Sequence, residues 1–134
     1  MNFALDTNTL IYFFKGLGNV ADRMLATPPT DIRIPAIVVY ELEAGIAKSS
    51  APAKRRQQLD ELLNTVELLP FDRSAARHAA EIRVWLERRG TPIGPMDTLI
   101  AATALANQAT LVTHNTREFE RVPALQVIDW FGEG

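Results

Sequence analysis

The chain has 134 residues, a net charge of −2 and no cysteine. At this length one domain can bury roughly two-thirds of its unfolded surface, so we expect a single domain over residues 1–134. The composition excludes a disulfide framework, a thiolate zinc site and a cysteine nucleophile, and the charge excludes a basic surface over the whole molecule.

Short apolar runs alternate with longer segments of helical periodicity along the chain. The apolar runs predict strands and the 3.6-residue periods predict helices. We expect strands over residues 2–5, 32–34, 66–69, 110–113 and 126–128, with a turn over 115–118. We expect helices over residues 7–16, 18–26, 36–48, 53–64, 73–89 and 97–108. This alternation is typical of an α/β fold with a parallel sheet and right-handed crossovers.

Three carboxylates occupy positions that face apolar surroundings. Asp6 ends the first strand, Glu41 falls inside a helical stripe with Ile37, Val38, Leu42 and Gly45, and Asp97 heads an apolar helix. A desolvated carboxylate must be paired, metal-bound or protonated. Because all three can meet at one edge of the sheet, we predict a divalent-metal site there.

Each acid also has a simpler interpretation. Asp6 is well placed to cap the helix that follows it, and Glu41 can pair with an arginine beneath it. Asp97 can complement the dipole of its helix. These alternatives stay open for each acid alone, but a metal site explains all three together.

Charge is distributed unevenly along the sequence. Residues 48–89 hold nine of the fourteen basic residues and six of the sixteen acids, a balance of +3, whereas the remainder carries −5. A cation in the acidic part would leave a basic flank free to meet phosphates. The alternative, in which these charges only solvate helix faces, also stays open.

Four motifs occur in a characteristic order. They are Leu5-Asp6-Thr7-Asn8, Val39-Tyr40-Glu41-Leu42, the run from Gly94 to Ala102, and the run from Leu111 to Phe119. Together they resemble a PIN-domain ribonuclease of the VapC type, the toxin of bacterial toxin–antitoxin pairs. The segment 88–95 is also similar to members of this family that cleave initiator transfer RNA.

The resemblance implies a three-layer α/β/α nuclease domain with a short parallel sheet and an acidic crevice. Asp6, Glu41 and Asp97 would be the acids of that crevice, and Asp6 and Asp97 would contact Mg²⁺, for which Mn²⁺ can substitute. Asn8 and Thr113 would orient these acids or a water molecule. The reaction would be hydrolysis of a phosphodiester without a covalent protein nucleophile.

The fourth acid of the family pattern is missing from its usual place, which holds Asn115 here. The nearest acids are Glu118 and Glu120. We predict that Glu118 completes the site, because Phe119 would anchor the turn and fix the direction of its neighbour. Asn115 would orient a water through its carbonyl oxygen.

The resemblance also implies partners: an RNA substrate, an antitoxin protein and a second copy of the chain, within a larger toxin–antitoxin assembly. We expect no membrane span and a cytoplasmic location, because no window holds eighteen apolar residues. Two other functions stay open. They are a catalytically inactive PIN-like binding module and a receiver-like phosphoacceptor domain, although the last lysine, Lys54, comes early for a receiver.

The two histidines have ordinary interpretations. His78 falls in the apolar stripe of its helix and is expected to be a core histidine. His114 follows a strand end near the predicted crevice, where it could touch substrate, although loop histidines are more often solvated.

Overall fold

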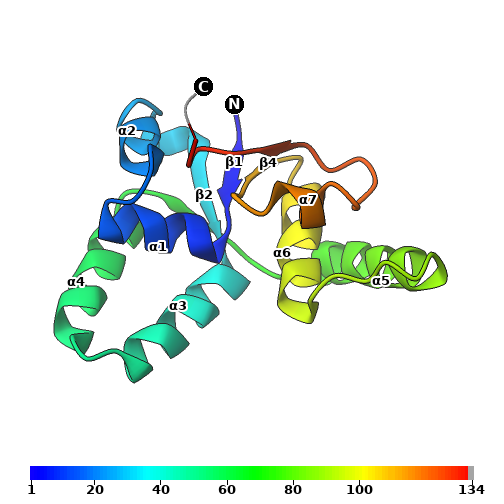
Figure 1. Cartoon of the computed structure of the whole chain (residues 1–134), viewed down its shortest axis with the longest axis horizontal. Coiled ribbons are helices and arrows are strands. Elements are labelled where there is room, and N and C mark those ends of the chain that lie inside the picture. The colour runs from blue at the N-terminus through cyan, green and yellow to red at the C-terminus, as the bar shows by residue number, and fades with distance from the viewer. Residues whose placement is uncertain (133–134) are drawn as a thin grey trace.

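The structure is a computed structural model in which residues 1–132 are described (Figure 1). The strands are β1 (Phe3–Leu5), β2 (Ile32–Pro35), β3 (Glu67–Leu69), β4 (Thr110–Val112) and β5 (Val127–Ile128). The helices are α1 (Thr7–Lys15), α2 (Val20–Leu25), α3 (Ala36–Lys48), α4 (Pro52–Leu63), α5 (Arg73–Arg88), α6 (Pro95–Ala106) and α7 (Thr116–Phe119), with a 3₁₀ turn at Pro29–Asp31.

The five strands form one parallel sheet in the order β3-β2-β1-β4-β5. Helices α1 and α4 lie on one side of this sheet, and α5 and α6 lie on the other (Figure 1). The arrangement confirms the predicted three-layer α/β/α fold. Because β1 is central and β4 is its neighbour, the residues that follow these two strands lie side by side at one edge.

Most elements differ from the prediction by one or two residues at an end, and two differences lie beside predicted site residues. Helix α6 begins at Pro95 rather than at Asp97, because proline suits the first position of a helix. Residues Thr116–Phe119 form one turn of helix, α7, where the sequence indicated only a turn. Both differences add helical backbone beside predicted site residues.

The core lies between the sheet and the helices. Strand residues contribute short, fully buried runs, and each covering helix contributes one apolar face. The largest side chains buried in this way include Leu5, Leu10, Ile34, Val38, Leu86, Ile100, Leu111 and Phe119. Among residues 1–132, no helix has both the length and the apolar character that crossing a bilayer requires.

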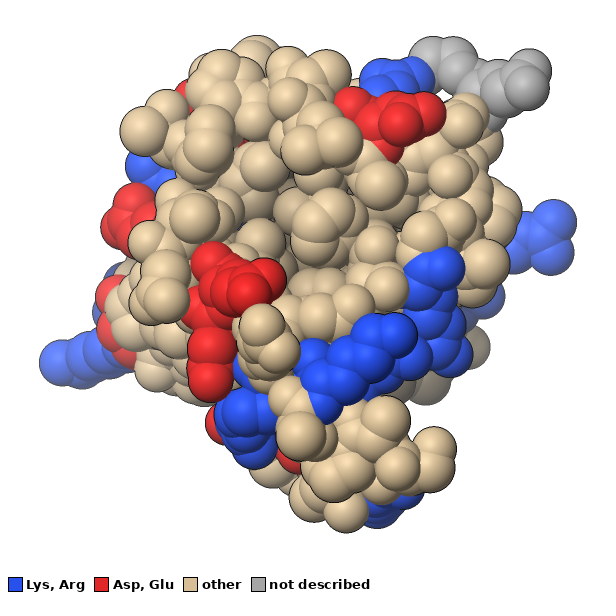
Figure 2. Space-filling model, turned by 90° about the vertical axis from the view of Figure 1, so that its left-hand side faces the viewer, with Lys and Arg blue, Asp and Glu red and all other residues tan. Residues whose placement is uncertain are grey.

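The basic segment 48–89 is divided between two sides of the molecule. Helix α4 carries basic residues at its start and acids toward its end, which Figure 2 shows as a basic band below an acidic cluster. Helix α5 lies at the opposite end of the molecule (Figure 1). Arg56 pairs with Glu43, and Arg83 pairs with Glu87. The segment therefore does not form one continuous basic flank.

Gly18 lies in a turn that brings the chain against Phe131. Its φ is +62°, and a Cβ atom at this position would lie 2.7 Å from the Phe131 ring. We expect Gly18→Ala to lower the free energy of unfolding by about 1 to 3 kcal/mol, because it adds both strain and a clash. Urea denaturation measures this loss.

A control is available at Gly45, within helix α3, where a Cβ atom would meet nothing within 4 Å. Gly45→Ala is expected to raise the free energy of unfolding by about 0.5 to 1 kcal/mol, because alanine favours the helix. Equal stability of the Gly18→Ala variant and the wild type would contradict the packing of Phe131 on this turn.

Candidate active site

Asp6 lies where β1 ends, beside the end of β4. Its backbone N–H donates to the carbonyl of Val112 at 3.1 Å, so the pairing of the two strands continues to this residue. Its Oδ2 accepts a hydrogen bond from Thr113 Oγ1 at 2.6 Å, and its Oδ1 accepts from the N–H of Thr9 at 2.9 Å. Asp6 is therefore both the N-cap of α1 and part of an acidic site.

Asp6 is 5% exposed. Burial raises its pKa, the hydrogen bonds from Thr113 and Thr9 oppose this rise, and the negative charge of Glu41 adds to it. Because burial outweighs the hydrogen bonds, the ionised form of Asp6 is destabilised. A nearby positive charge would relieve this cost.

Glu41 lies at the edge of the buried stripe of α3, not inside it as predicted. The buried residues of this helix are Val38, Leu42 and Ile46, whereas Gly45 is exposed. The centre of the stripe is therefore rotated by about 100° from Glu41 around the helix. Glu41 is half-buried, and its Oε1 accepts a hydrogen bond from Thr7 Oγ1 at 2.6 Å.

Glu118 is held by the backbone of one loop and the side chain of another. Its Oε1 accepts from the N–H of Gly94 at 3.1 Å, and its Oε2 accepts from Asn115 Nδ2 at 2.6 Å. Gly94 is the N-cap of α6, which carries Asp97 in its first turn. Glu118 thus ties α7 to the start of α6, next to Asp97.

Thr113 joins the two halves of the site. Its hydroxyl donates to Asp6 and accepts from the N–H of Asn115 at 3.0 Å. Asn115 in turn donates to Glu118. An unbroken chain of hydrogen bonds therefore links Asp6 to Glu118. Thr113 contacts an acid, whereas Asn115 contacts Glu118 through its amide nitrogen, so the predicted orienting of a water by the Asn115 carbonyl oxygen stays a prediction.

The Asp97 and Glu118 carboxyls titrate as a pair. The pKa of Asp97 is raised to about 7, first by burial, then by the charge of Glu118 and a hydrogen bond to it, and further by the charges of Asp6 and Glu41. For Glu118, burial raises the pKa, but the Gly94 N–H, Asn115, Asp97 and the charge of Arg121 together lower it. In this pair a proton is therefore held on Asp97 in preference to Glu118.

The neighbours of Glu118 support its selection over Glu120. Phe119 is 1% exposed and anchors α7 to the core, as predicted. Glu118 precedes this anchor and is turned toward Gly94, whereas Glu120 follows it and is exposed. The structure brings Glu118 to Asp97, while its function there stays a prediction.

Asn8 is exposed, and no hydrogen bond joins its side chain to an acid within residues 1–132. Its orienting role therefore stays a prediction. The sequence interpretation missed Thr7, which binds Glu41, and Gly94, which binds Glu118. Thr7 lies 34 residues from Glu41, and Gly94 acts through its backbone, so neither left a signal in the sequence.

The donor set suits a hard divalent cation. Within residues 1–132, no lysine, arginine or histidine forms an ion pair with Asp6, Glu41, Asp97 or Glu118. Across the same residues, no three acidic, histidine or cysteine side chains are arranged to hold one ion directly. Mg²⁺ commonly binds through one or two carboxylates and keeps several waters, and the binding of such an ion by Asp6 and Asp97 stays a prediction.

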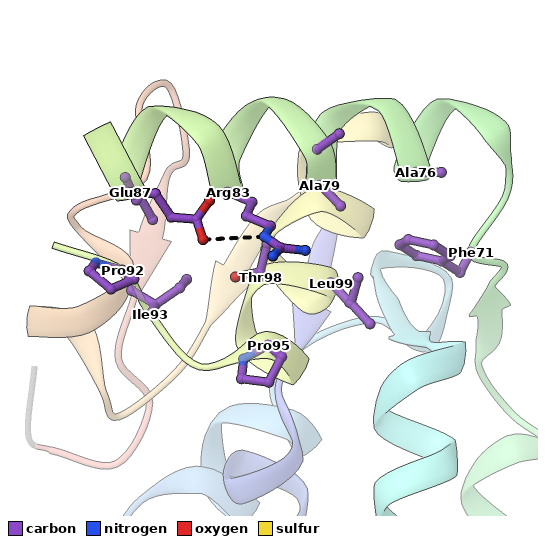
Figure 3. Close-up of a pocket in the computed structure, with 12 residues that line it drawn as sticks. Phe71, Ala76, Ala79, Arg83, Glu87, Pro92, Ile93, Pro95, Thr98 and Leu99 are labelled. Carbon is purple, nitrogen blue, oxygen red and sulfur yellow. Dashed lines mark hydrogen bonds and ion pairs between the residues drawn. The ribbon is translucent and has the colours of Figure 1, made fainter. Parts of the chain in front are cut away.

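A separate cavity of about 570 Å³ lies between α5 and the start of α6. Figure 3 shows Ile93, Pro95 and Leu99 around it, with the Arg83–Glu87 ion pair on α5. None of the four predicted site acids lines this cavity. It is therefore distinct from the acidic site, although both border the start of α6.

Comparison with known proteins identifies relatives over almost the whole chain. The PIN domain family matches residues 3–125. A tRNA(fMet)-specific endonuclease VapC of Salmonella typhimurium is 36% identical over 130 residues, which cover 97% of this chain and 98% of the relative. A ribonuclease VapC2 of Rickettsia felis is 36% identical over 138 residues, with the same coverage of both chains.

Solved structures agree with this assignment. A VapBC2 complex from Rickettsia felis bound to promoter DNA contains a chain with TM-score 0.89 and 34% identity, covering 97% of this chain and 99% of that one. A DNA-bound VapBC complex from Salmonella typhimurium gives TM-score 0.90 and 37% identity, with coverage of 97% and 98%. The receiver-like alternative is therefore wrong. With a parallel sheet that places Asp6 beside Thr113 and a family match over residues 3–125, the chain belongs to the PIN-domain family, among the ribonucleases of the VapC type.

Proposed function

We propose that this protein is a divalent-metal-dependent endoribonuclease that acts as a toxin and cleaves structured RNA such as transfer RNA. The observation that carries this proposal is the linked set Asp6, Thr113, Asn115 and Glu118 beside Asp97, with no cationic side chain paired to the acids within the described residues. Residues 1–134 are taken as one nuclease domain. Mg²⁺ is the proposed ion, with Mn²⁺ as a substitute.

Asp6 and Asp97 would hold the cation, and the chemistry of carboxylate oxygens fits this task. A bound divalent cation supplies a water of lowered pKa and stabilises negative charge on the phosphate. Thr113 and Thr9 fix both oxygens of Asp6, so this carboxylate is oriented before any ligand arrives. Glu118, fixed by Gly94 and Asn115, faces Asp97 and accepts its proton or hydrogen bond. Thr7 holds Glu41 on the α3 side of the crevice.

Transfer RNA is the proposed substrate class because the relatives from Salmonella typhimurium and Shigella flexneri are named as tRNA(fMet)-specific endonucleases. Initiator transfer RNA is accordingly the first candidate. The basic start of α4, which includes Lys54 and Arg55, offers positive charge to an RNA backbone. Figure 2 shows basic side chains gathered beside an acidic cluster on the side of the molecule where α4 lies.

An antitoxin partner is proposed because the solved VapBC structures contain toxin–antitoxin pairs. A groove of about 400 Å³ between α1, α3 and α4 is lined by apolar side chains such as Ile11, Leu42 and Ile46 and reaches Glu41 at its edge. A partner segment in this groove would end beside the carboxylates, where an arginine or lysine would neutralise them and exclude the metal. A homodimer within a larger toxin–antitoxin assembly and a cytoplasmic location belong to the same proposal.

Expression of the chain alone is expected to arrest growth of a bacterial host, and co-expression of a short reading frame next to its gene should relieve the arrest. Fragment ends mapped from total RNA of the arrested cells should cluster within transfer RNA. The Asp97→Asn variant, produced at the same level, serves as the inactive control. Harmless expression together with robust RNA cleavage in vitro would contradict the toxin assignment while leaving the nuclease assignment intact.

A further inference from the structure

Beside the acidic site, three rings form a cluster that the proposed mechanism does not use. The imidazole of His114 stacks on Phe131, with ring centroids 4.3 Å apart and an interplanar angle of 27°. Tyr12 is the third ring of the cluster. Its ring centroid lies 5.9 Å from that of His114 and 4.9 Å from that of Phe131, and its ring is nearly perpendicular to the imidazole. Such stacked and edge-to-face pairs favour fixed ring geometry.

Asp129 holds the imidazole in one orientation. His114 Nδ1 lies 2.9 Å from Asp129 Oδ2, and the other oxygen of Asp129 accepts from the N–H of Phe131 at 2.8 Å. With Nδ1 directed at a carboxylate, Nε2 is left for another partner. The His114 side chain is nevertheless 45% exposed. A solvent-accessible ring held by this many contacts is preorganised for a ligand.

The cluster borders the acidic site through the chain itself. His114 lies between Thr113, which binds Asp6, and Asn115, which binds Glu118. On α1, the exposed Asn8 precedes Tyr12 by four residues, so both lie on the same face of that helix. Asn8, two residues after Asp6, and Tyr12, at the ring cluster, therefore lie on one face of α1.

We propose that His114 is a nucleobase-binding residue, which stacks an unpaired base of the RNA strand next to the cleaved bond and hydrogen-bonds it through Nε2. This proposal rests on the proposed ribonuclease function. Proteins commonly recognise single-stranded RNA through bases that stack on their aromatic or histidine rings. A phosphate suits the cluster less well, because Asp129 places a carboxylate directly against the imidazole.

Kinetics with purified initiator transfer RNA, the proposed substrate, test this role. His114→Ala is expected to raise KM by about 5- to 100-fold with little change in kcat, because one base contact is lost. His114→Phe keeps a stacking ring and should restore KM to within about threefold of the wild type. The matched control is His78→Ala on α5, since His78 is the other histidine and its one hydrogen bond within residues 1–132 is with the carbonyl of Ser74.

Two results would overturn the proposal. A KM for His114→Ala equal to that of the wild type would show that no contact exists. A His114→Phe variant as impaired as His114→Ala would show that the ring binds through its nitrogen alone, as a phosphate contact would. Thermal unfolding of each variant identifies any increase in KM that comes from a weakened fold instead of a lost contact.

Direct binding separates this proposal from the function on which it rests. The Asp97→Asn variant, without metal, is titrated with a ten-nucleotide single-stranded RNA or with inorganic phosphate, while the NMR signals of the two histidines are followed. The RNA should shift the His114 signals and leave those of His78 unchanged, and phosphate alone should shift neither. Absence of a His114 shift at millimolar RNA would overturn base binding, whereas an inert wild-type enzyme would overturn only the nuclease function.

Discussion

Asp97→Asn is expected to reduce RNA cleavage at least about 100-fold, because the variant loses a carboxylate that would hold the metal ion. The substitution keeps the size of the side chain and its place in the first turn of α6. The buried residues of this helix, among them Ile100 and Ala101, are untouched, so the fold should persist. Initial rates at saturating Mg²⁺ measure the effect, with circular dichroism as the check on folding.

The same variant should be more stable than the metal-free wild type at pH 7.5. The raised pKa of Asp97, about 7, means that the folded protein binds a proton there that the unfolded chain, with an ordinary pKa of 3.8, releases. The contribution of this proton to the free energy of unfolding is fully present below the pKa of Asp97 in the unfolded chain. It is lost as the pH rises through the folded-state pKa of about 7. Because Asp97 is only half-buried, solvent screens its charge. We therefore expect the free energy of unfolding of the variant to exceed that of the metal-free wild type by only about 1 to 2 kcal/mol, less than the free energy that corresponds to the whole pKa shift.

Melting temperatures measured from pH 4 to pH 8 without metal check this prediction. The difference in melting temperature between Asp97→Asn and the wild type should be small near pH 4 and larger near pH 8. Mg²⁺ should raise the melting temperature of the wild type and have less effect on the variant. A difference that does not change with pH, or cleavage by the variant at the wild-type rate, would contradict the role assigned to Asp97.

Glu118→Gln is expected to weaken metal affinity and cleavage by about 10- to 100-fold, as loss of a partner that orients a metal ligand typically does. Glu118 is fixed by Gly94 and Asn115 and faces Asp97, so a neutral amide removes charge from the centre of the network. Calorimetric titration with Mn²⁺ and initial cleavage rates measure the two losses separately.

Two neighbouring variants serve as controls for this position. Glu120→Gln should be nearly neutral, because Glu120 is exposed beyond the Phe119 anchor. Asn115→Ala should lower activity with a smaller effect on metal affinity, since it frees Glu118 and Thr113 without removing charge. If Glu120→Gln were damaging and Glu118→Gln silent, the fourth acid would have to be reassigned.

The sequence was most informative where local pattern and global topology coincide. Apolar runs of three to four residues located the strands, and the strand ends placed Asp6 and Thr113 at one edge of the sheet. Glu118 could be selected because Phe119 next to it is an obvious anchor. These inferences depend on neighbours within a few residues, which the sequence displays directly.

Contacts between distant segments could not be predicted. The hydrogen bond from Thr7 to Glu41 joins residues 34 positions apart, and Gly94 contributes a backbone N–H that has no side-chain signature. The error at Glu41 arose from taking Ile37 and Gly45 as centres of the inward stripe of α3, although the fully buried residues of that helix are Val38, Leu42 and Ile46. Glycine carries no side chain that reveals which way it faces.

Cleavage of purified initiator transfer RNA by the wild-type protein, measured with Mg²⁺ and with excess EDTA, tests whether the site needs a metal ion. We expect defined fragments with Mg²⁺, none with EDTA, and recovery when Mg²⁺ or Mn²⁺ is added back. The Asp97→Asn variant in parallel excludes a contaminating nuclease. Undiminished cleavage in EDTA, or equal cleavage by the variant, would contradict a metal-dependent ribonuclease site built on Asp6 and Asp97.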